Sequence, residues 1–449
     1  MTVFEAGRAV GGMCRTLTLW GMKADVGPHR FFSTNKKVND LWVQVVGKDY
    51  TFVNRLTRIF YKNTFYAYPV SAMNVLRNLG IFETMRCLAS YMQEKLHPVY
   101  QKSTFETWVI SRFGRRLYEI FFKTYSEKLW GISCNQLDAD FAKQRIKKFS
   151  LLEAIKNTFY PTSHPTLLDS FAYPRKGTGF VYSQMAKKIK QSGGTIILNV
   201  PVKRVLIRGM KACGIELLSG EKYMFDHIIS TMPITRMVIG LPNVTEKVAR
   251  AVSKLRFRNT IIVYLCVSRT DLFPDQWIYI HAQNVKVGRI TNFRNWVPEL
   301  YGDKNNTILA MEYWFHDEDL TWRETDEKQL LDLAGREIVE IGLARKEDIV
   351  SGKIYKIPKC YPIYDRNYKK NLSIVVTFLE NFHNLHVLGR GGAFKYNNQD
   401  HSILMGILAA ENIAECAKHN LWVINTDTDY QEGARITETG LIENTFRSI

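Results

Sequence analysis

Residues 2–16, TVFEAGRAVGGMCRT, are the stretch on which the fold assignment depends. The first four of them read as a short β-strand that ends in an acid, Glu5, and the pair Gly11-Gly12 and then Arg15 follow. In a dinucleotide-binding β-α-β unit, an acid at the end of the second strand holds the ribose hydroxyls, roughly 20 residues after a G-x-G-x-x-G turn that seats the pyrophosphate. That turn occurs nowhere in the sequence, since Gly177-Thr178-Gly179 lacks the third glycine. The stretch is therefore either half of a cofactor site or a strand that only looks like one.

The composition is that of a basic globular protein. Lysine and arginine outnumber aspartate and glutamate by 61 to 43 over 449 residues, and the net charge of +18 favours anionic partners such as a phosphorylated small molecule or an anionic membrane surface. Nucleic acid is the weaker interpretation, because the basic residues are dispersed and no nucleic-acid-binding motif accompanies them.

Cysteine usage and hydropathy indicate a cytoplasmic protein. The seven cysteines are scattered without a C-x-x-C pair, which is typical of reduced thiols and not of a disulfide framework or a zinc site. The N-terminus shows no signal-peptide pattern, and the apolar stretch 260–267 is far too short to span a bilayer. We expect no transmembrane segment, while peripheral membrane contact and the oligomeric state stay open.

The order of strand and helix patterns predicts an α/β fold whose Rossmann-like, doubly wound core is assembled from distant segments. Residues 1–35 read as part of a nucleotide-binding β-α-β unit without its first strand, and 36–170 as a mainly helical insertion. The core resumes at 171–240, where a helix over 180–191 precedes a strand over 195–199. A mixed antiparallel sheet over 241–355 forms a second domain. A core segment with a long helix over 356–425 and a polar tail over 426–449 complete the chain.

A glycine-rich motif near the C-terminus, VLGRGGAFKY over 387–396, is the most informative pattern in the chain. A strand runs into Gly389, and a helix begins near Asp400. Free N–H groups at that helix N-terminus, together with Arg390, would suit a phosphate or a flavin carbonyl. The alternative is a plain turn with Asp400 as the N-cap. From the residues alone the two interpretations are even.

Two further patterns carry candidate site residues. In FKTYSEKLWG, over 122–131, Tyr125 and Trp130 could offer flat faces to a base or sugar, and Arg145 and Lys148 could neutralise phosphates. An aromatic core stripe beside a solvated basic turn is the better interpretation on spacing alone. After Asp25, the Gly27-Pro28 turn would carry His29 and Arg30 outward.

Neither a Ser-His-Asp order, nor paired carboxylates, nor metal-ligand spacing is recognisable in the sequence. The chemistry would therefore come from a bound cofactor.

Taken in order, these motifs resemble those of the UDP-galactopyranose mutases and, more broadly, of the amine-oxidase and protoporphyrinogen-oxidase superfamily of FAD proteins. The second strand with its GG-x-x-R-T turn, the Gly-Pro-His-Arg-Phe segment over 27–31 and the glycine-rich motif from Gly389 to Asp400 each have a counterpart there. So do the aromatic stretch over 65–70 with Asn74, and the region from Trp108 to Lys148, which holds the most distinctive match.

The resemblance implies FAD as cofactor and a nucleotide-linked sugar as substrate, rearranged with reduced flavin and no net oxidation. By resemblance, Tyr125 and Trp130 would bind the uridine, Arg289 and Tyr396 would grip the pyrophosphate, and His29 would lie near the flavin. Catalysis would then depend on His29, Arg289 and Tyr396. The implied FAD contacts, from the adenosine end to the isoalloxazine end, are Glu5, Gly11, Gly12, Arg15, Val202, Gly27, His29, Gly389, Arg390 and Asp400.

Departures from the family pattern leave two other functions open. Lys148, Phe394 and Asn398 stand where the family has arginine, tyrosine and aspartate, and region 255–315 is more similar to the oxidase-like relatives, which favours an FAD-dependent oxidoreductase. The first strand of the nucleotide-binding unit, its glycine-rich turn and its helix are missing from the pattern. We therefore expect the chain as written to bind FAD poorly or not at all, and a cofactor-free remnant is the third alternative.

Overall fold

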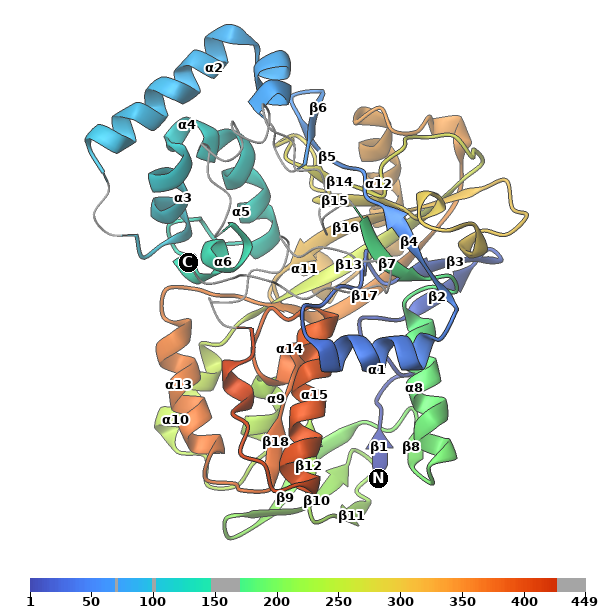
Figure 1. Ribbon diagram of the computed structural model, residues 1–449, viewed down its shortest axis with the longest axis vertical. Helices are drawn as coiled ribbons and strands as arrows, with labels where there is room; N and C mark the ends of the chain where they lie inside the picture. Colours follow the sequence, from blue (N-terminus) through green and yellow to red (C-terminus); the bar gives the residue numbers. More distant parts are fainter. Residues whose placement is uncertain (69–71, 99–101, 147–169, 426–449) are drawn as a thin grey trace.

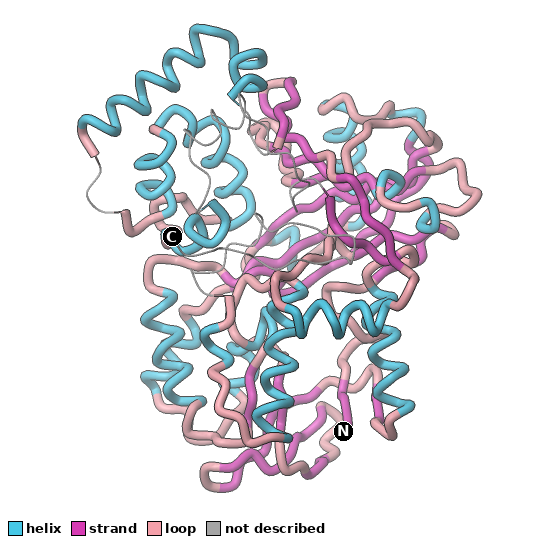
Figure 2. Tube along the Cα trace, viewed as in Figure 1, coloured by secondary structure: helices cyan, strands magenta, loops and turns pink. Residues whose placement is uncertain are grey.

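A computed structural model describes residues 1–68, 72–98, 102–146 and 170–425. Helices and strands alternate in the lower part of the molecule, whereas the upper part separates into a helical region and a large sheet (Figures 1 and 2). Residues 426–449, the predicted polar tail, and Lys148 lie outside the described residues.

The lower part contains the α/β core that the sequence predicts. Strand β1 (Thr2–Phe4) pairs in parallel with β8 (Thr195–Ile197), and β12 (Ile228–Ser230) pairs in parallel with β18 (Leu385–Val387). Segments more than 150 residues apart in sequence are thus neighbours in one layer, as in a doubly wound fold. The accompanying elements are α1 (Lys36–Val46), α8 (Gly179–Gln191), α14 (Gly389–Gly392), α15 (Gln399–Ala414) and an antiparallel sheet of β9 (Val202–Arg208), β10 (Lys211–Leu217) and β11 (Lys222–Met224).

A seven-stranded sheet lies beside the helical region and draws two of its strands, β5 and β6, from outside the predicted range 241–355 (Figure 1). Its order is β17-β13-β16-β15-β14-β5-β6, and its longest pairing joins β13 and β17, both antiparallel to their neighbours. Helix α12 (Glu327–Glu340) packs on one face through Leu330, Ala334 and Ile338. The strands are β5 (Thr57–Tyr61), β6 (Thr64–Ala67), β13 (Phe257–Val267), β14 (Trp277–Ile280), β15 (Arg289–Asn292), β16 (Thr307–Phe315) and β17 (Ile349–Pro362).

The helical insertion differs from its prediction in two ways. Residues 50–67 are not helical but form strands, because period-2 β-branched and aromatic residues flank a tight turn at Lys62-Asn63, where both φ angles are positive. Apolar residues recur over 106–127 at the three- and four-residue steps typical of a helix, but these residues do not form one continuous helix, because Gly114 at φ 80° ends α3. The region comprises α2 (Ala72–Leu96), α3 (Phe105–Phe113), α4 (Arg115–Tyr118), the π-helix η1 (Glu119–Lys123), α5 (Thr124–Trp130) and α6 (Ala139–Ile146).

Short elements connect these parts. Two antiparallel pairs, β2 (Thr16–Leu19) with β3 (Met22–Asp25) and β4 (Tyr50–Asn54) with β7 (Ser170–Pro174), join the core to the large sheet. None of the described helices is long and apolar enough to cross a membrane. The remaining elements are α9 (Ile234–Ile239), α10 (Glu246–Ser253), α11 (Leu320–Arg323), α13 (Tyr368–Leu379) and the 3-10 helices η2 (Phe293–Asn295), η3 (Pro298–Leu300), η4 (Lys346–Asp348) and η5 (Leu421–Val423).

Candidate active site

Glu5 lies directly after β1, at the carboxyl end of a strand parallel to β8. Its Oε1 accepts the Gly7 N–H (2.6 Å), and a Cβ at Gly7 would lie 2.9 Å from that oxygen and 3.0 Å from an Arg15 nitrogen. Arg15 Nε in turn donates to the Gly12 carbonyl (2.7 Å). Gly11 and Gly12 have φ of 102° and 55°, and no atom lies within 4 Å of a Cβ placed at Gly12. The backbone at Gly12 is therefore open to close approach by a ligand, whereas a Cβ at Gly11 would lie 3.3 Å from Tyr182.

Asp25 fixes this segment to helix α8. Its buried carboxylate accepts hydrogen bonds from the hydroxyls of Thr16 (2.6 Å) and Tyr173 (2.7 Å) and from the N–H of Thr178 (3.1 Å), next to the start of α8. Burial raises the Asp25 pKa to about 6, against the opposing effect of these donors. The Gly179 N–H donates to Thr16 (2.8 Å), so the helix N-terminus is used within the protein.

His29 follows the Gly27-Pro28 turn and is neutral at pH 7. Burial and the positive charges of Arg390 and Arg289 lower its pKa to about 4. Its Nε2 lies 2.9 Å from the Val26 carbonyl, so this nitrogen carries the ring proton. A Cβ at Gly27, whose φ is 93°, would lie 3.8 Å from His29 Nε2 and 3.9 Å from Glu312 Oε1. The turn therefore borders the strands that carry Arg289 and Glu312.

Arg289 on β15 and Glu312 on β16 face each other across paired strands. Their two parallel hydrogen bonds are both 2.7 Å long, and the side chains are only 16% and 2% exposed. Tyr125 on α5 belongs to the same group. Burial raises its pKa well above the usual range, the positive charge of Arg289 opposes that shift, and Tyr396 is among its neighbours. The ring of Tyr125 also stacks on His281 at 5.1 Å. Arg289 is thus held rigidly, with two phenols close by.

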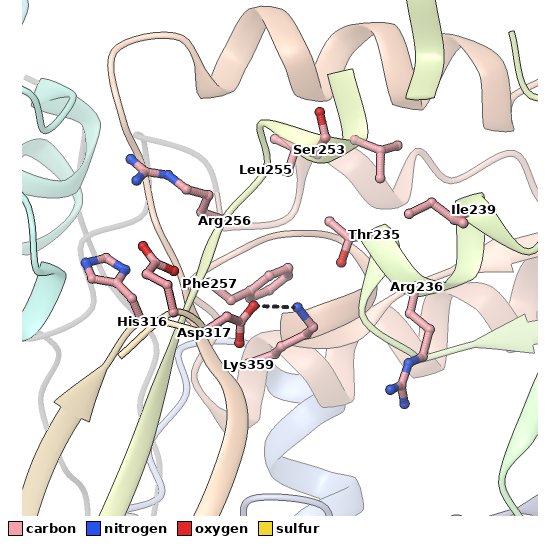
Figure 3. Close-up of a pocket in the computed structure, with 12 residues that line it drawn as sticks. Thr235, Arg236, Ile239, Ser253, Leu255, Arg256, Phe257, His316, Asp317 and Lys359 are labelled. Atoms are coloured by element: carbon pink, nitrogen blue, oxygen red, sulfur yellow. Dashed lines mark hydrogen bonds and ion pairs between the residues drawn. The ribbon is translucent and has the colours of Figure 1, made fainter. Parts of the chain in front are cut away.

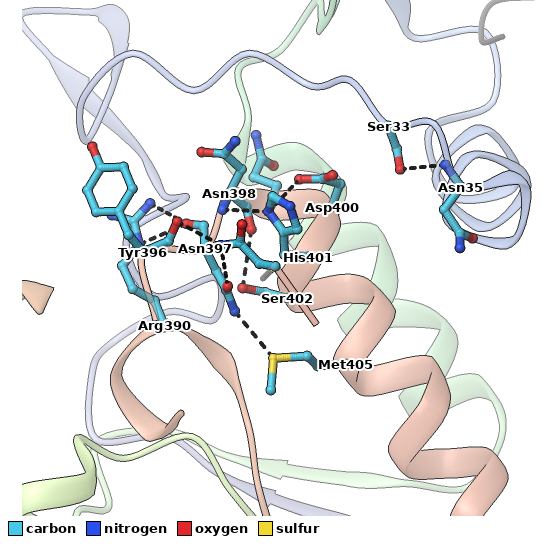
Figure 4. Close-up of polar contacts among 12 residues, drawn as sticks. Ser33, Asn35, Arg390, Tyr396, Asn397, Asn398, Asp400, His401, Ser402 and Met405 are labelled. Atoms are coloured by element: carbon cyan, nitrogen blue, oxygen red, sulfur yellow. Dashed lines mark hydrogen bonds and ion pairs between the residues drawn. The ribbon is translucent and has the colours of Figure 1, made fainter. Parts of the chain in front are cut away.

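Arg390 organises the loop that carries Tyr396 (Figure 4). Its Nε (2.9 Å) and Nη2 (2.5 Å) both donate to the Asn397 carbonyl, so this fork is directed at the backbone. The guanidinium lies 5.4 Å from the ring of Tyr361 and 5.1 Å from that of Tyr396, and the two rings stack at 5.3 Å. Arg390 keeps its charge in the site while it fixes the position of Tyr396.

The N-terminus of α15 is not capped by Asp400, which was one of the two interpretations that the sequence left even. Asn398, not Asp400, is the N-cap, and its N–H donates to His401 Nδ1 (3.1 Å) in a reciprocal capping arrangement. Asp400 lies buried in the first turn, beside His401. Asn398, which stands where the family has aspartate, therefore has a structural role.

The other predicted site residues lie apart or inside the protein. Trp130 is fully buried, and its ring contacts those of Phe141 (4.7 Å) and Tyr396 (5.7 Å), so it supports Tyr396 from behind and offers no accessible face. Val202 begins β9 in the core sheet, and the backbone of Arg145 lies in α6.

Sequence reasoning missed Glu312, Tyr361 and Lys128. Glu312 had a signal, since a charged residue inside the buried strand TILAMEYWF needs a partner. Lys128 had none. Its Nζ donates to the carbonyls of Ala282 (2.6 Å) and Val287 (3.2 Å), more than 150 residues away, and so braces the loop before Arg289.

A cavity of about 420 Å³ adjoins this region (Figure 3). Phe257 lines it and packs on Phe394 at 4.9 Å, two residues before Tyr396. Lys359, whose φ is 51°, pairs with Asp317 at 3.4 Å on its wall. The cavity therefore borders the loop that carries Tyr396.

The residues present fit the two ends of an FAD molecule. Glu5 at the end of a parallel strand suits a ribose hydroxyl, and the turn that is open at Gly12, together with Arg15, suits a phosphate. At the end of β18, Gly389 has a φ of 80° and leads into the loop shared with Arg390 and Tyr396. His29, which follows Gly27, lies close enough to Arg390 of this loop to feel its charge. These residues can hold the flavin end.

Comparisons with known proteins agree with this geometry. The family model for flavin containing amine oxidoreductases matches residues 1–352. The fold is similar to a crystal structure of reduced UDP-galactopyranose mutase, with a TM-score of 0.81 and 20% identity over 94% of this chain and 93% of that one. It is also similar to putrescine oxidase, with a TM-score of 0.60 and 15% identity over 92% of this chain and 93% of that one. A CLA-producing fatty acid isomerase from P. acnes has a TM-score of 0.61 and 11% identity over 91% of this chain and 92% of that one. Since the family match covers well over half of the sequence, this chain belongs to the flavin-containing amine oxidoreductase family, and its cofactor is FAD.

Proposed function

We propose that this protein is a flavin-dependent enzyme of the mutase type, which acts on a nucleotide-linked sugar through reduced flavin. The observation that carries the proposal is the group formed by Arg289, Tyr125 and Tyr396. A guanidinium held by Glu312 at two points, next to two tyrosines, is suited to grip a diphosphate.

The charge of the site supports an anionic substrate over an amine. Arg289 is balanced by Glu312, whereas Arg390 donates to carbonyl oxygens and forms no ion pair with any acid in the described part of the chain, so it adds positive charge. His29 is neutral at pH 7 because its pKa is about 4. A cationic amine would meet net positive charge here, while a pyrophosphate would be attracted.

Each group then has a stated role. The reduced flavin, when bound, supplies the nucleophilic chemistry at the sugar. Arg289 orients the pyrophosphate. Tyr125 stays protonated, because its pKa is raised, and so remains a hydrogen-bond donor. Neutral His29, with its proton directed at Val26, positions the flavin end and is no acid at pH 7. The fold similarity to reduced UDP-galactopyranose mutase supports the same assignment.

An FAD-dependent oxidoreductase is the second candidate. It is favoured by the family description and by the similarity to putrescine oxidase. The stacked pair Tyr361–Tyr396 could equally flank an oxidisable substrate.

One experiment separates the two. FAD-loaded protein is reduced with dithionite and incubated with UDP-sugars, and the products are separated by chromatography, while oxygen uptake is followed in parallel with amines. We expect an isomerised sugar nucleotide and no amine-dependent oxygen uptake. Oxygen uptake without isomerisation would establish the oxidoreductase instead.

The variant Arg289→Lys tests the residue that carries the proposal. Lysine keeps the charge but cannot form the two-point contact, so kcat/KM should fall at least about tenfold with unchanged flavin content. Arg204→Lys is the control, because Arg204 on β9 also forms a charged pair through Nε and Nη2, both donating to Glu216 Oε2 on β10, outside the site. Equal activity of the two variants would contradict the role of Arg289.

A further inference from the structure

Helix α2 turns its apolar side away from the protein. The helix is interrupted at Gly80 (φ 77°, ψ 166°), and residues 81–96 form its second segment. At 100° per residue, the exposed apolar side chains of this segment fall within one arc of about 120°. Phe82 is 87% exposed and Leu96 77%, values typical of fully solvated side chains. The other large members of the arc are Ile81, Met85, Leu88 and Met92.

The inner side of the same segment is polar and fixed. Glu83 forms an ion pair with Arg116 of α4, Ser90 Oγ accepts the Arg116 N–H (3.1 Å), and Cys87 is buried. A Cβ at Gly114 would lie 2.7 Å from the Tyr91 backbone nitrogen, so the α3–α4 turn approaches α2 closely. Rotating the helix to bury its apolar side would break these contacts. The exposed arc is thus a fixed feature of the fold.

Basic residues flank the arc on both sides. Arg86 is 75% exposed on one flank, and Lys95, stacked on Tyr91 at 5.1 Å, is exposed on the other. The acids Glu83 and Glu94 point to the inner side, about 180° from the centre of the arc. A groove of about 470 Å³ beside the helix is lined by three arginines, among them Arg86, and by the two acids Glu94 and Glu119.

We propose that residues 81–96 form an interfacial helix that docks this enzyme on an anionic lipid bilayer. An apolar stripe bordered by basic side chains is the pattern of helices that lie in a membrane interface, where the apolar face enters the acyl boundary and the cations meet lipid phosphates. The helix lies at the outer edge of the helical region, with α3 and α4 on one side only, so a flat surface can reach it (Figure 1). The net charge of +18 acts in the same direction.

A second copy of the chain fits this surface less well. The segment is roughly 24 Å long and about 10 Å wide, so its face covers roughly 240 Å², well below the roughly 800 Å² per partner of a stable interface. Helix pairing would also bring Arg86 and Lys95 of one copy close to the same cations of the other copy. Glu83 pairs with Arg86 at 3.7 Å, but the arc itself carries no acid that could meet the cations of a second copy.

The test is sedimentation of the full-length, FAD-loaded protein with sucrose-filled vesicles of phosphatidylcholine alone or mixed with phosphatidylglycerol. We expect binding to the anionic vesicles that decreases with salt. The double variant Phe82→Gln, Met85→Gln should bind vesicles at least about tenfold more weakly than the wild type. The double variant Arg86→Gln, Lys95→Gln should bind anionic vesicles more weakly. The control Leu218→Gln with Met224→Gln removes equally exposed apolar groups from another surface and should bind like the wild type.

Circular dichroism and the flavin spectrum establish that all variants are folded. Wild-type protein that stays in the supernatant with both vesicles, or Phe82 and Met85 variants that bind unchanged, would overturn the proposal. Equal binding to both vesicle types would overturn the anionic assignment. Sedimentation velocity that shows a dimer dissociated by the Phe82 and Met85 changes, without vesicle binding, would assign the surface to a second copy.

Discussion

At the scale of single residues, Asp25 shows how burial competes with hydrogen bonding. Three donors, from Thr16, Tyr173 and Thr178, point at its carboxylate, and each favours the charged form. Burial nevertheless dominates and raises the pKa from its ordinary value of 3.8 to about 6. The folded state is therefore more stable when the Asp25 carboxyl group is protonated than when it is ionised.

This gives Asp25 a defined effect of pH on stability. Between pH 4 and pH 6 the folded state keeps a proton that the unfolded chain releases, so raising the pH destabilises the fold. The free energy of unfolding of the wild type, relative to Asp25→Asn, should fall by up to about 3 kcal/mol from pH 4 to pH 7. His29, with its lowered pKa, acts in the opposite sense in the same range, so denaturation curves of both proteins must be compared. A difference that stays constant with pH would contradict the prediction.

At the scale of elements, docking of α8 depends on a glycine. Gly177 has a φ of 90°, and a Cβ there would lie 2.5 Å from Thr16 Oγ1 and 2.6 Å from Thr16 Cγ2. Gly177→Ala should therefore combine a left-handed backbone penalty of about 1–2 kcal/mol with overpacking of about 1–3 kcal/mol.

The matched control lies at the other end of the same helix. Gly193 also has a positive φ, of 80°, but no atom would lie within 4 Å of a Cβ placed there. Gly193→Ala should therefore lower the unfolding free energy by the left-handed backbone penalty alone, without overpacking. Denaturant unfolding of the two variants measures the difference. If both lose the same stability, the close contact between Gly177 and Thr16 does not hold α8.

Elements with strong local signals were predictable from the sequence. The helix expected over 180–191 is observed as Gly179–Gln191, and the glycine-rich turn after β18 leads into α15 as expected. The strands over 50–67 were missed, because their signal is short and is surrounded by helical periodicity. The outward face of α2 was also missed, since periodicity indicates an apolar side but not which way it faces.

At the scale of the whole molecule, the candidate site could be predicted only in part. Arg289, Tyr125 and Tyr396 lie on three segments of the chain and come together in the structure, while their roles stay a prediction. Glu312 and Lys128, which hold Arg289 and the loop before it, act through strand register and loop packing. Those relations exist only after the large sheet has formed, so no local pattern could reveal them.

Because its implied contacts lie on separate segments, FAD should stabilise the whole fold by mass action. At a free FAD concentration 100 times Kd, the gain in unfolding free energy is about 2.7 kcal/mol. Glu5→Gln removes a charge-assisted contact to the ribose, worth about 1.5–3 kcal/mol, so its Kd should rise at least about tenfold. The variant should then match the wild type in thermal stability without FAD but gain less at every FAD concentration. Thermal unfolding across an FAD titration checks this, and coinciding curves for the two proteins would show that Glu5 does not hold the cofactor.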